Sequence, residues 1–332
     1  MAHLQRTNTP QEREAAIAAA VEALRAGAVV AIPTETVYGL AANALDPKAV
    51  ERIYTVKGRP GHNPIIVHVA SAEMARACAR GWPETADRLA NAFWPGPLTL
   101  VLPKALIVPD IVTAGGDTVG IRWPNHPLTQ EIIRRCGFPL AAPSANPSGR
   151  ISPTTAEHVE RSLGARIPLI IDGGPSEIGL ESTVLDISVA PAQLLRPGMI
   201  HAESLAAVLG EVRTSPGQES STLRSPGLLL KHYSPKARFW VWDKDETELK
   251  RALERAGIPL DRVYYLGWSR VPSVPFGGVS LLAREAHAFA RALYAELHQA
   301  DEARPDLIVL EEVPEGPEWS AVRDRLRRAA AD

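Results

Sequence analysis

Short apolar segments alternate with longer helix-like segments along most of the chain, and this alternation constrains the fold more than any other feature. Residues 28–33 and 65–69 are apolar and rich in β-branched side chains, whereas residues 11–26 and 47–56 have the pattern of helices. Strands that alternate with helices predict an α/β protein in which helices cover a sheet. The many prolines argue against a simple doubly wound parallel sheet, so we expect a mixed sheet.

The same order continues through the first two-thirds of the chain. We expect a helical region at 71–93, broken at Pro83, because proline removes a backbone donor. The remaining predictions are strands at 97–103, 118–122, 138–146, 167–174 and 181–188 and helices at 126–136 and 154–163.

A stretch rich in serine, proline, glycine and threonine, residues 213–227, divides the chain. Beyond it the alternation resumes, with strands at 237–242, 261–268 and 305–313 and helices at 245–256 and 283–299. This order predicts a second, smaller α/β domain with a parallel sheet. We therefore expect a first domain at 1–212, a linker at 213–236 and a C-terminal domain at 237–332.

Composition narrows the class of protein. The 332 residues are 45% hydrophobic and 22% charged, as in ordinary globular proteins, and the net charge is −2. The charge is evenly distributed, which excludes a globally basic nucleic-acid-binding protein but leaves a local basic cleft possible. No apolar run approaches a membrane span and no apolar signal core begins the chain, so we expect a cytoplasmic protein. Cys78 and Cys136 are too few for a disulfide framework or a cysteine-rich zinc site.

Standard motifs for nucleotide binding and hydrolysis are missing from the sequence. It contains no P-loop, no glycine-rich dinucleotide motif, no serine nucleophile elbow and no zinc-binding helix motif. Polar residues instead collect at the ends of predicted strands and in turns rich in proline and glycine, where α/β proteins bind ligands.

Residues 57–64, KGRPGHNP, present two cations in a stiff loop. Lys57 and Arg59 taken alone would be solvated surface charges. The surrounding glycines and prolines limit the freedom of the loop, so less entropy is lost when the cations bind a ligand. With Asn63 as a further donor, the loop suits a polyphosphate. We expect both cations to lie outside the core.

Three further residues could serve either structure or function. Arg122 is the single charge in an apolar strand, and a buried charge needs a partner, which an anionic substrate group would supply. His68 lies in a strand, where a lone histidine is more often a satisfied core residue. Thr34 follows a buried strand and is a plausible N-cap of a short helix.

Polar side chains also fill a turn and flank two later strands. The turn APSANPSGRIS holds Ser144, Asn146, Ser148 and Ser152, while Ser182 opens one strand and Arg196 closes another. A capped loop without a ligand is the simpler interpretation of the turn.

Together these segments resemble one family along nearly the whole chain. PTETVYGLAANA, KGRP with NPIIVHV, WPGPLTLVL, VGIRWPNH, APSANPSG, ESTVLD and LLRPG occur in the order and spacing of the YrdC-like domain. RSPGLLLKHYSP, followed by an α/β tail that ends in DRLRRAA, is similar to the two-domain, long form of the threonylcarbamoyl-AMP synthases. Leu228 and Leu230 depart from the methionine and aromatic residue that are usual in the family, which affects the packing of the linker rather than the reaction.

The resemblance implies both a fold and a reaction. The fold is a YrdC-like twisted mixed-sheet domain with an open cleft, plus a smaller Rossmann-like α/β C-terminal domain. The reaction is a nucleotidyl transfer that condenses L-threonine, bicarbonate and ATP into threonylcarbamoyl-AMP and pyrophosphate. Mg²⁺ would arrive with ATP, because no carboxylate cluster suggests a protein-held ion. Threonylcarbamoyl-transferase proteins would then pass the product to tRNA.

The resemblance also implies roles for individual residues. The wall of the cleft that faces phosphate and carbamate would consist of Lys57, Arg59, Ser144 and Asn146. Threonine would contact Thr36, His68, Arg122, the backbone of Ala142, and Ser182. ATP would contact Arg59, Asn63, Thr118, Ser144, Ser152 and Arg196.

The three leucines before His232 and Tyr233 suggest that the linker segment 224–235 buries against a surface. We expect it to close over the cleft as a lid, so that His232 and Tyr233 approach the nucleotide and exclude water. A packed interdomain hinge is the alternative.

Two other functions fit the same fold. An RNA-binding module would use a concave basic face, against which the even charge balance argues. Carbamoyl transfer, as in hydrogenase maturation, brings zinc-finger cysteines that the two separated cysteines cannot supply.

Overall fold

The computed structural model describes residues 2–214, 232–243 and 245–331, and the chain divides into two compact units. Residues up to 148 and from 152 to 228 form one unit, which we call the first domain. Residues 149–151 and those from 229 onward form the other, which we call the second domain. The predicted limits of the linker remain a prediction, since residues 215–231 lie outside the described part of the chain.

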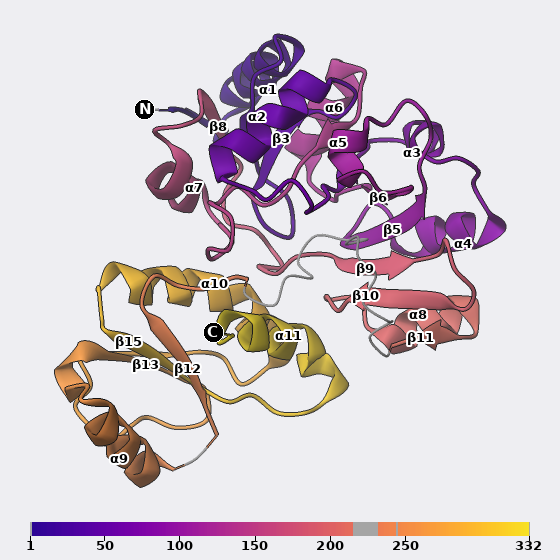
Figure 1. The fold of residues 1–332 in the computed structure, drawn as a ribbon. Helices are drawn as coiled ribbons and strands as arrows, with labels where there is room; N and C mark the ends of the chain where they lie inside the picture. The colour runs from indigo at the N-terminus through magenta and orange to yellow at the C-terminus, as the bar shows by residue number, and fades with distance from the viewer. Residues whose placement is uncertain (1, 215–231, 244, 332) are drawn as a thin grey trace. The chain divides into compact units, whose positions relative to one another are not determined.

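A mixed sheet of eleven strands runs through the described part of the first domain (Figure 1). In sheet order the strands are β1 (His3–Arg6), β8 (Leu169–Asp172), β2 (Val30–Ile32), β3 (Gly39–Asn43), β7 (Leu140–Ala141), β4 (Val67–His68), β6 (Thr118–Arg122), β5 (Leu98–Pro103), β9 (Thr183–Asp186), β10 (Ala192–Arg196) and β11 (Val212–Arg213). The sheet combines parallel pairs, such as β4 with β6, and antiparallel pairs, such as β5 with β6. The prediction of a mixed sheet is confirmed.

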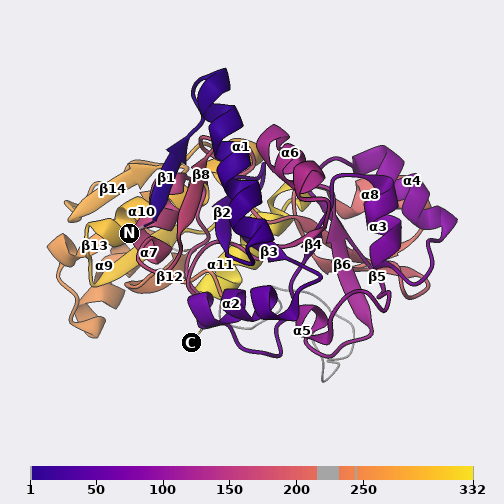
Figure 2. The same cartoon turned by 90° about the horizontal axis from the view of Figure 1, so that it is seen from above.

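Helices cover the sheet of the first domain on both faces. They are α1 (Pro10–Arg25), α2 (Pro47–Lys57), α3 (Ala72–Cys78), α4 (Glu84–Phe93), α5 (Asp110–Thr113), α6 (Pro127–Cys136), α7 (Ala156–Leu163) and α8 (Ala202–Leu209). The alternation of side chains along β2 creates two cores. Val30 and Ile32 pack into the core that α1 and α6 cover, whereas Ala31 packs into the core with α2 and α7. Figure 2 shows α1 and α6 side by side.

The first domain confirms one local prediction and corrects another. The helical region predicted at 71–93 is interrupted, because α3 ends at Cys78 and Pro83 is the N-cap of α4. The helix expected after Thr34 is absent from the described residues. The Thr34 hydroxyl accepts the backbone N–H groups of Thr36 and Val37, each at 3.2 Å, and so closes a turn. That turn leads into β3, which pairs antiparallel with β2.

The second domain contains a wholly parallel sheet of four strands among its described residues. In sheet order these are β12 (Arg238–Trp242), β15 (Leu307–Glu311), β13 (Val263–Gly267) and β14 (Gly278–Leu281). Its helices are α9 (Glu246–Ala256), α10 (Ala286–Glu302) and α11 (Ser320–Ala329), with 3-10 turns at Leu260–Arg262 and Pro317–Trp319. Leu249 and Leu253 of α9 pack against the sheet. The predicted smaller domain with a parallel sheet is therefore confirmed.

None of the helices in the described ranges has both the length and the apolar character that crossing a membrane requires.

Candidate active site

Lys57 lies at the C-terminal end of α2 and is buried, with 3% of its surface exposed. The helix ends there because Gly58 adopts a left-handed conformation, with φ of 60°, that favours glycine. Lys57 Nζ donates to the carbonyl oxygens of Ser144 and Asn146. Burial, and after it the positive charge of Arg59, lower the pKa of Lys57 well below its usual value. The expectation that this cation lies outside the core was wrong, because the turn 144–146 covers it.

Arg59 is also buried, so the same expectation was wrong for the second cation of the loop. Its guanidinium folds back onto the loop, with Nε donating to Asn63 O at 3.0 Å and Nη2 to Pro64 O at 2.6 Å. The side-chain amide of Asn63 is fully buried, and neither its oxygen nor its nitrogen has a hydrogen-bond partner among the described residues. A buried amide without partners is costly, and a ligand would satisfy it.

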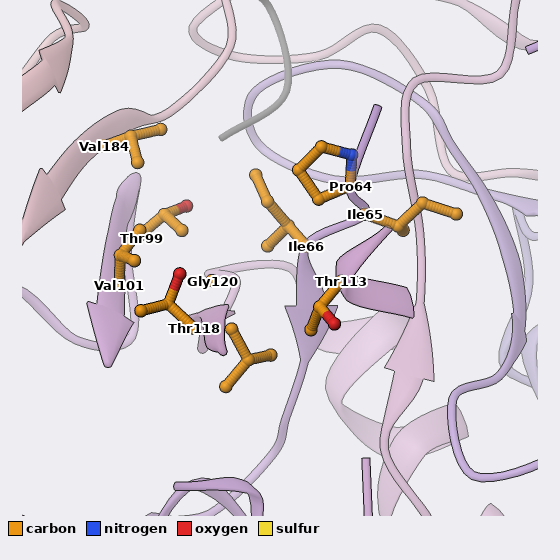
Figure 3. Close-up of a pocket in the computed structure, with 10 residues that line it drawn as sticks. Pro64, Ile65, Ile66, Thr99, Val101, Thr113, Thr118, Gly120 and Val184 are labelled. Atoms are coloured by element: carbon orange, nitrogen blue, oxygen red, sulfur yellow. The ribbon is translucent and has the colours of Figure 1, made fainter. Parts of the chain in front are cut away.

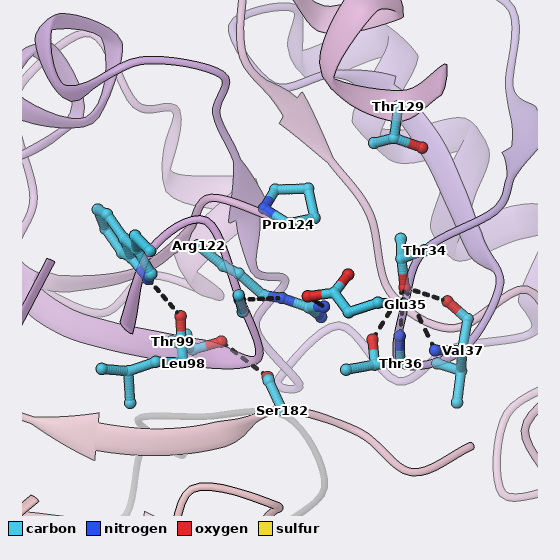
Figure 4. A network of polar contacts seen from close by, with 12 residues as sticks. Thr34, Glu35, Thr36, Val37, Leu98, Thr99, Arg122, Pro124, Thr129 and Ser182 are labelled. Carbon is cyan, nitrogen blue, oxygen red and sulfur yellow. Dashed lines mark hydrogen bonds and ion pairs between the residues drawn. The ribbon is translucent and has the colours of Figure 1, made fainter. Parts of the chain in front are cut away.

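Arg122 lies at the end of β6 and is paired within the protein (Figure 4). Its Nη2 is 2.7 Å from Glu35 Oε1, and both side chains are at most 5% exposed. Its Nε donates to Gly96 O at 3.3 Å. The expectation that this charge needs a partner is confirmed, and Glu35 is a partner within the protein. The sequence signal was present, because Glu35 is itself a lone carboxylate in an apolar segment.

His68 lies beside Arg122 because β4 and β6 are parallel and place the two residues in register. Its Nδ1 lies 3.4 Å from Ile66 O. Burial, followed by the positive charge of Arg122, lowers the pKa of His68 to about 3. The imidazole is therefore neutral at physiological pH and can donate or accept a hydrogen bond.

Ser182 and Arg196 are joined at the start of β9. Arg196 donates from Nε to Ser182 O and from Nη2 to Ser182 Oγ, both at 3.1 Å. The Ser182 hydroxyl is also 2.8 Å from Thr99 Oγ1 on the neighbouring strand β5 (Figure 4). Thr99 was not predicted, because a threonine inside an apolar strand gives no signal of its own.

The remaining predicted contacts lie in the first domain as well. Thr36 Oγ1 is 2.8 Å from Thr34 Oγ1. The Ala142 N–H donates to Ile66 O, and the predicted contact of its backbone with threonine stays a prediction. Ser152 is fully buried and donates to Glu181 Oε1 at 2.6 Å, so Glu181 is another carboxylate that sequence reasoning missed.

Thr118 borders a small pocket that has room for about one water molecule (Figure 3). Its other walls are mostly apolar: Pro64, Ile65, Ile66, Thr99, Val101, Thr113, Val119, Gly120 and Val184. A pocket of this size is too small for the ring of a ligand.

His232 and Tyr233 pack within the second domain. Their rings meet edge to face at 4.0 Å, and Tyr233 lies 6.0 Å from the ring of Tyr294. The guanidinium of Arg325 lies 5.4 Å from the centre of the Tyr233 ring. Their predicted approach to a nucleotide stays a prediction, and residues 224–231 of the expected lid lie outside the described part of the chain.

Metal ligands do not gather in the ranges that the structure describes. No group of three or more histidine, cysteine, aspartate or glutamate side chains there could hold a metal ion. That Mg²⁺ arrives with ATP stays a prediction.

The fold and the site define a two-domain α/β protein whose first domain has buried cations and unsatisfied polar groups suited to an anionic ligand. A family model described as telomere recombination matches residues 22–198. A second, described as the C-terminal domain of threonylcarbamoyl-AMP synthase, matches residues 200–331.

Relatives of known name match the chain over nearly its whole length. It is 42% identical to threonylcarbamoyl-AMP synthase of Pyrococcus abyssi, with 92% of each chain covered. It is also 42% identical to that of Bacillus subtilis, which covers 98% of this chain and 94% of the relative. The crystal structure of P. abyssi Sua5 complexed with L-threonine matches with a TM-score of 0.90 and 40% identity, over 99% of this chain and 97% of that one. The chain belongs to the threonylcarbamoyl-AMP synthase family.

Proposed function

We propose that this protein condenses L-threonine, bicarbonate and ATP into threonylcarbamoyl-AMP and pyrophosphate. The observation that carries the proposal is the fully buried amide of Asn63, whose oxygen and nitrogen have no hydrogen-bond partner among the described residues. A buried amide in this state is costly, and a ligand with both donors and acceptors would satisfy it. ATP carries both kinds of group and would bind beside Lys57 and Arg59 of the same loop.

Threonine would bind at the end of β6. Arg122 Nε donates to Gly96 O and Nη2 is paired with Glu35. The third nitrogen, Nη1, makes no hydrogen bond or ion pair with the described residues. It is therefore the donor available to the carboxylate of threonine, as a charge-assisted hydrogen bond. The neutral ring of His68 stands beside it, and Thr36 and Ser182 offer hydroxyl groups to the rest of the substrate.

ATP would bind along the loop 57–64 and the turn 142–152. The Asn63 amide would gain the partners that it lacks among the described residues. Thr118, at the start of β6, would contact the nucleotide. Mg²⁺ would come with the triphosphate and neutralise part of its charge, without a ligand set of its own in the protein.

The chemistry requires no protein nucleophile. The amine nitrogen of threonine forms a bond to the carbon of bicarbonate, and water leaves, which gives a carbamate. An oxygen of the carbamate then attacks the α-phosphorus of ATP, and the bond to pyrophosphate breaks. Lys57 and Arg59 would hold the reacting groups in place and stabilise the negative charge in the transition state.

The product is a labile adenylate, so an acceptor reaction must follow. We place that reaction on tRNA, through threonylcarbamoyl-transferase proteins, in the cytoplasm. Direct binding of tRNA by this chain is not part of the proposal, because the net charge of −2 gives no general attraction to RNA.

An omission experiment tests the function. The protein is incubated with L-threonine, bicarbonate and ATP, and pyrophosphate is measured enzymatically. We expect release only when all three substrates are present. Release that continues without threonine would identify a different nucleotide reaction.

A further inference from the structure

Glu35 is a carboxylate without a hydrogen-bond donor. It is 2% exposed, and neither of its oxygens makes a hydrogen bond with a described residue. Its contact with Arg122 is close, at 2.7 Å, but not aligned as a hydrogen bond. Carboxylates that are buried to this extent normally accept several hydrogen bonds. The acceptor capacity that remains at Glu35 therefore indicates a donor outside the protein.

The hydroxyl groups beside Glu35 are directed elsewhere. The hydroxyl of Thr34 donates to Val37 O at 2.6 Å and lies 2.8 Å from the hydroxyl of Thr36 (Figure 4). The backbone at Glu35 is fixed, because its carbonyl accepts from Ile178 N at 2.8 Å. The carboxylate thus stays beside Arg122 with unused lone pairs.

The position of Glu35 relative to the proposed substrate identifies the donor. If Arg122 holds the carboxylate of threonine, the amine of threonine lies next to the same guanidinium, because both groups are attached to one carbon atom. The amine enters as an ammonium ion, and its nitrogen must lose a proton before it can attack bicarbonate. We propose that Glu35 is the catalytic base that takes this proton.

The step balances. Glu35 accepts one proton from the ammonium group, which leaves R–NH₂ and a protonated Glu35. The lone pair of the amine forms the nitrogen–carbon bond with bicarbonate. Hydroxide leaves that carbon and takes the second amine proton as water, so the product is R–NH–COO⁻.

Three other titratable groups lie around Glu35. Arg122 is a cation and cannot accept a proton. His126 is close enough to feel the charge of Glu35, and its Nδ1 has no hydrogen-bond partner in the described residues. Burial lowers the pKa of His126, which the negative charges of Glu35 and Glu177 raise again in part. His68 lies next to Arg122 and is neutral.

A pH profile of Glu35→Gln tests the proposal, which rests on the proposed function. At neutral pH we expect kcat/KM for threonine to fall by about 10²- to 10⁴-fold, the usual contribution of a general base. As the pH rises toward the pKa of the threonine amine, free amine becomes available from solution. The ratio of wild-type to variant kcat/KM should then shrink by about tenfold for each pH unit.

Two further variants keep the test decisive. Glu35→Asp keeps a negative charge beside Arg122, so it should fold even if Glu35→Gln does not. Because its side chain is shorter, the ratio of wild-type to variant kcat/KM should again shrink as the pH rises. Asp186→Asn is the matched control, because Asp186 is fully buried and caps Ser188. It should leave the pH profile unchanged.

The outcomes separate the two proposals. A wild-type protein that releases no threonine-dependent pyrophosphate would defeat the proposed function. The wild type could instead be active while the Glu35 variants are impaired by the same factor at every pH. That result would overturn the role of Glu35 as a base but leave the proposed function intact, since Glu35 would then only pair with Arg122.

Discussion

Two buried glutamates, one in each domain, differ in how the protein satisfies them. Glu311 of the second domain, at the end of β15, accepts the N–H groups of Trp268 and Ser269 at 2.9 and 3.0 Å, and the hydroxyl of Ser269 as well. Glu35 of the first domain has one ion contact and no hydrogen bond with a described residue. Donors from its own domain meet the needs of Glu311, so it serves structure. No described residue donates a hydrogen bond to Glu35, which indicates that the first domain binds a ligand there.

Among the substitutions that compare the two domains, Lys57→Met should give the largest effect. The methionine keeps most of the stem but loses the donor to Ser144 and Asn146. We expect turnover to fall by about 10²- to 10³-fold, as when a preorganised donor is removed from an active site. The melting temperature should fall too, because two buried carbonyl groups lose their partner. Steady-state kinetics and calorimetry check both.

The control is Lys48→Met, on the exposed first turn of the same helix. It should change neither quantity. Undiminished turnover in Lys57→Met would remove this lysine from the reaction.

Arg122→Gln should separate threonine binding from ATP binding. Loss of a charge-assisted hydrogen bond contributes about 1.5–3 kcal/mol, so the Kd for threonine should rise by about 10- to 100-fold. The Kd for ATP should hardly change. Isothermal titration with each ligand decides this, and equal losses for both ligands would contradict the assignment. Stability should also fall, because Glu35 remains as an unpaired buried charge.

Glu311→Gln applies the same kind of change to the second domain and sharpens the comparison. The amide cannot accept all three donors on its two former oxygens, so we expect a loss of about 1–3 kcal/mol of stability. Threonine and ATP should bind as in the wild type. If the affinity for threonine fell as far as in Arg122→Gln, the claim that Glu311 serves structure alone would be contradicted.

The pH dependence of stability gives the smallest effect when it is expressed for each unit of pH. The pKa of His68 is about 3 in the folded protein, below the value of about 6.5 in an unfolded chain. As the pH falls through this window, the unfolded chain binds a proton that the folded protein does not. Stability therefore falls with falling pH, by at most about 1.4 kcal/mol per pH unit from this residue.

His68→Asn should make that slope shallower when unfolding by urea is followed at several pH values. His62→Asn, at an exposed position, is the control and should leave it as it is. An unchanged slope in His68→Asn would mean that His68 takes up its proton as easily when folded as when unfolded.

The spacing of apolar residues and the positions of proline and glycine were sufficient to predict most of the helices and strands. The helix predicted at 47–56 is Pro47–Lys57, and the break at Pro83 is where the sequence indicated it. The wrong helix after Thr34 arose because a threonine hydroxyl caps turns and helices with the same hydrogen bonds. β14, with its half-exposed GVSL, lacked the apolar character of a predicted strand.

The site was harder to predict, because its partners are distant in sequence. The sequence around Lys57 does not show that a distant turn covers it. Its two hydrogen bonds reach residues that are 87 and 89 positions away. The pair of Glu35 and Arg122 could have been found by asking which lone carboxylate in an apolar segment balances a lone buried cation. That no described residue donates a hydrogen bond to Glu35 can be seen only in the folded structure.

Carbon labelling tests the central claim most directly. The protein is given L-threonine, ATP and ¹³C-bicarbonate, and the adenylate is trapped and analysed by mass spectrometry and NMR. The account predicts one labelled carbon, bonded to the nitrogen of threonine and linked through oxygen to the phosphate of AMP, in equal amount to the pyrophosphate released. An adenylate of threonine itself, with no label, would contradict it, because the first domain would then activate the carboxylate that we assign to Arg122.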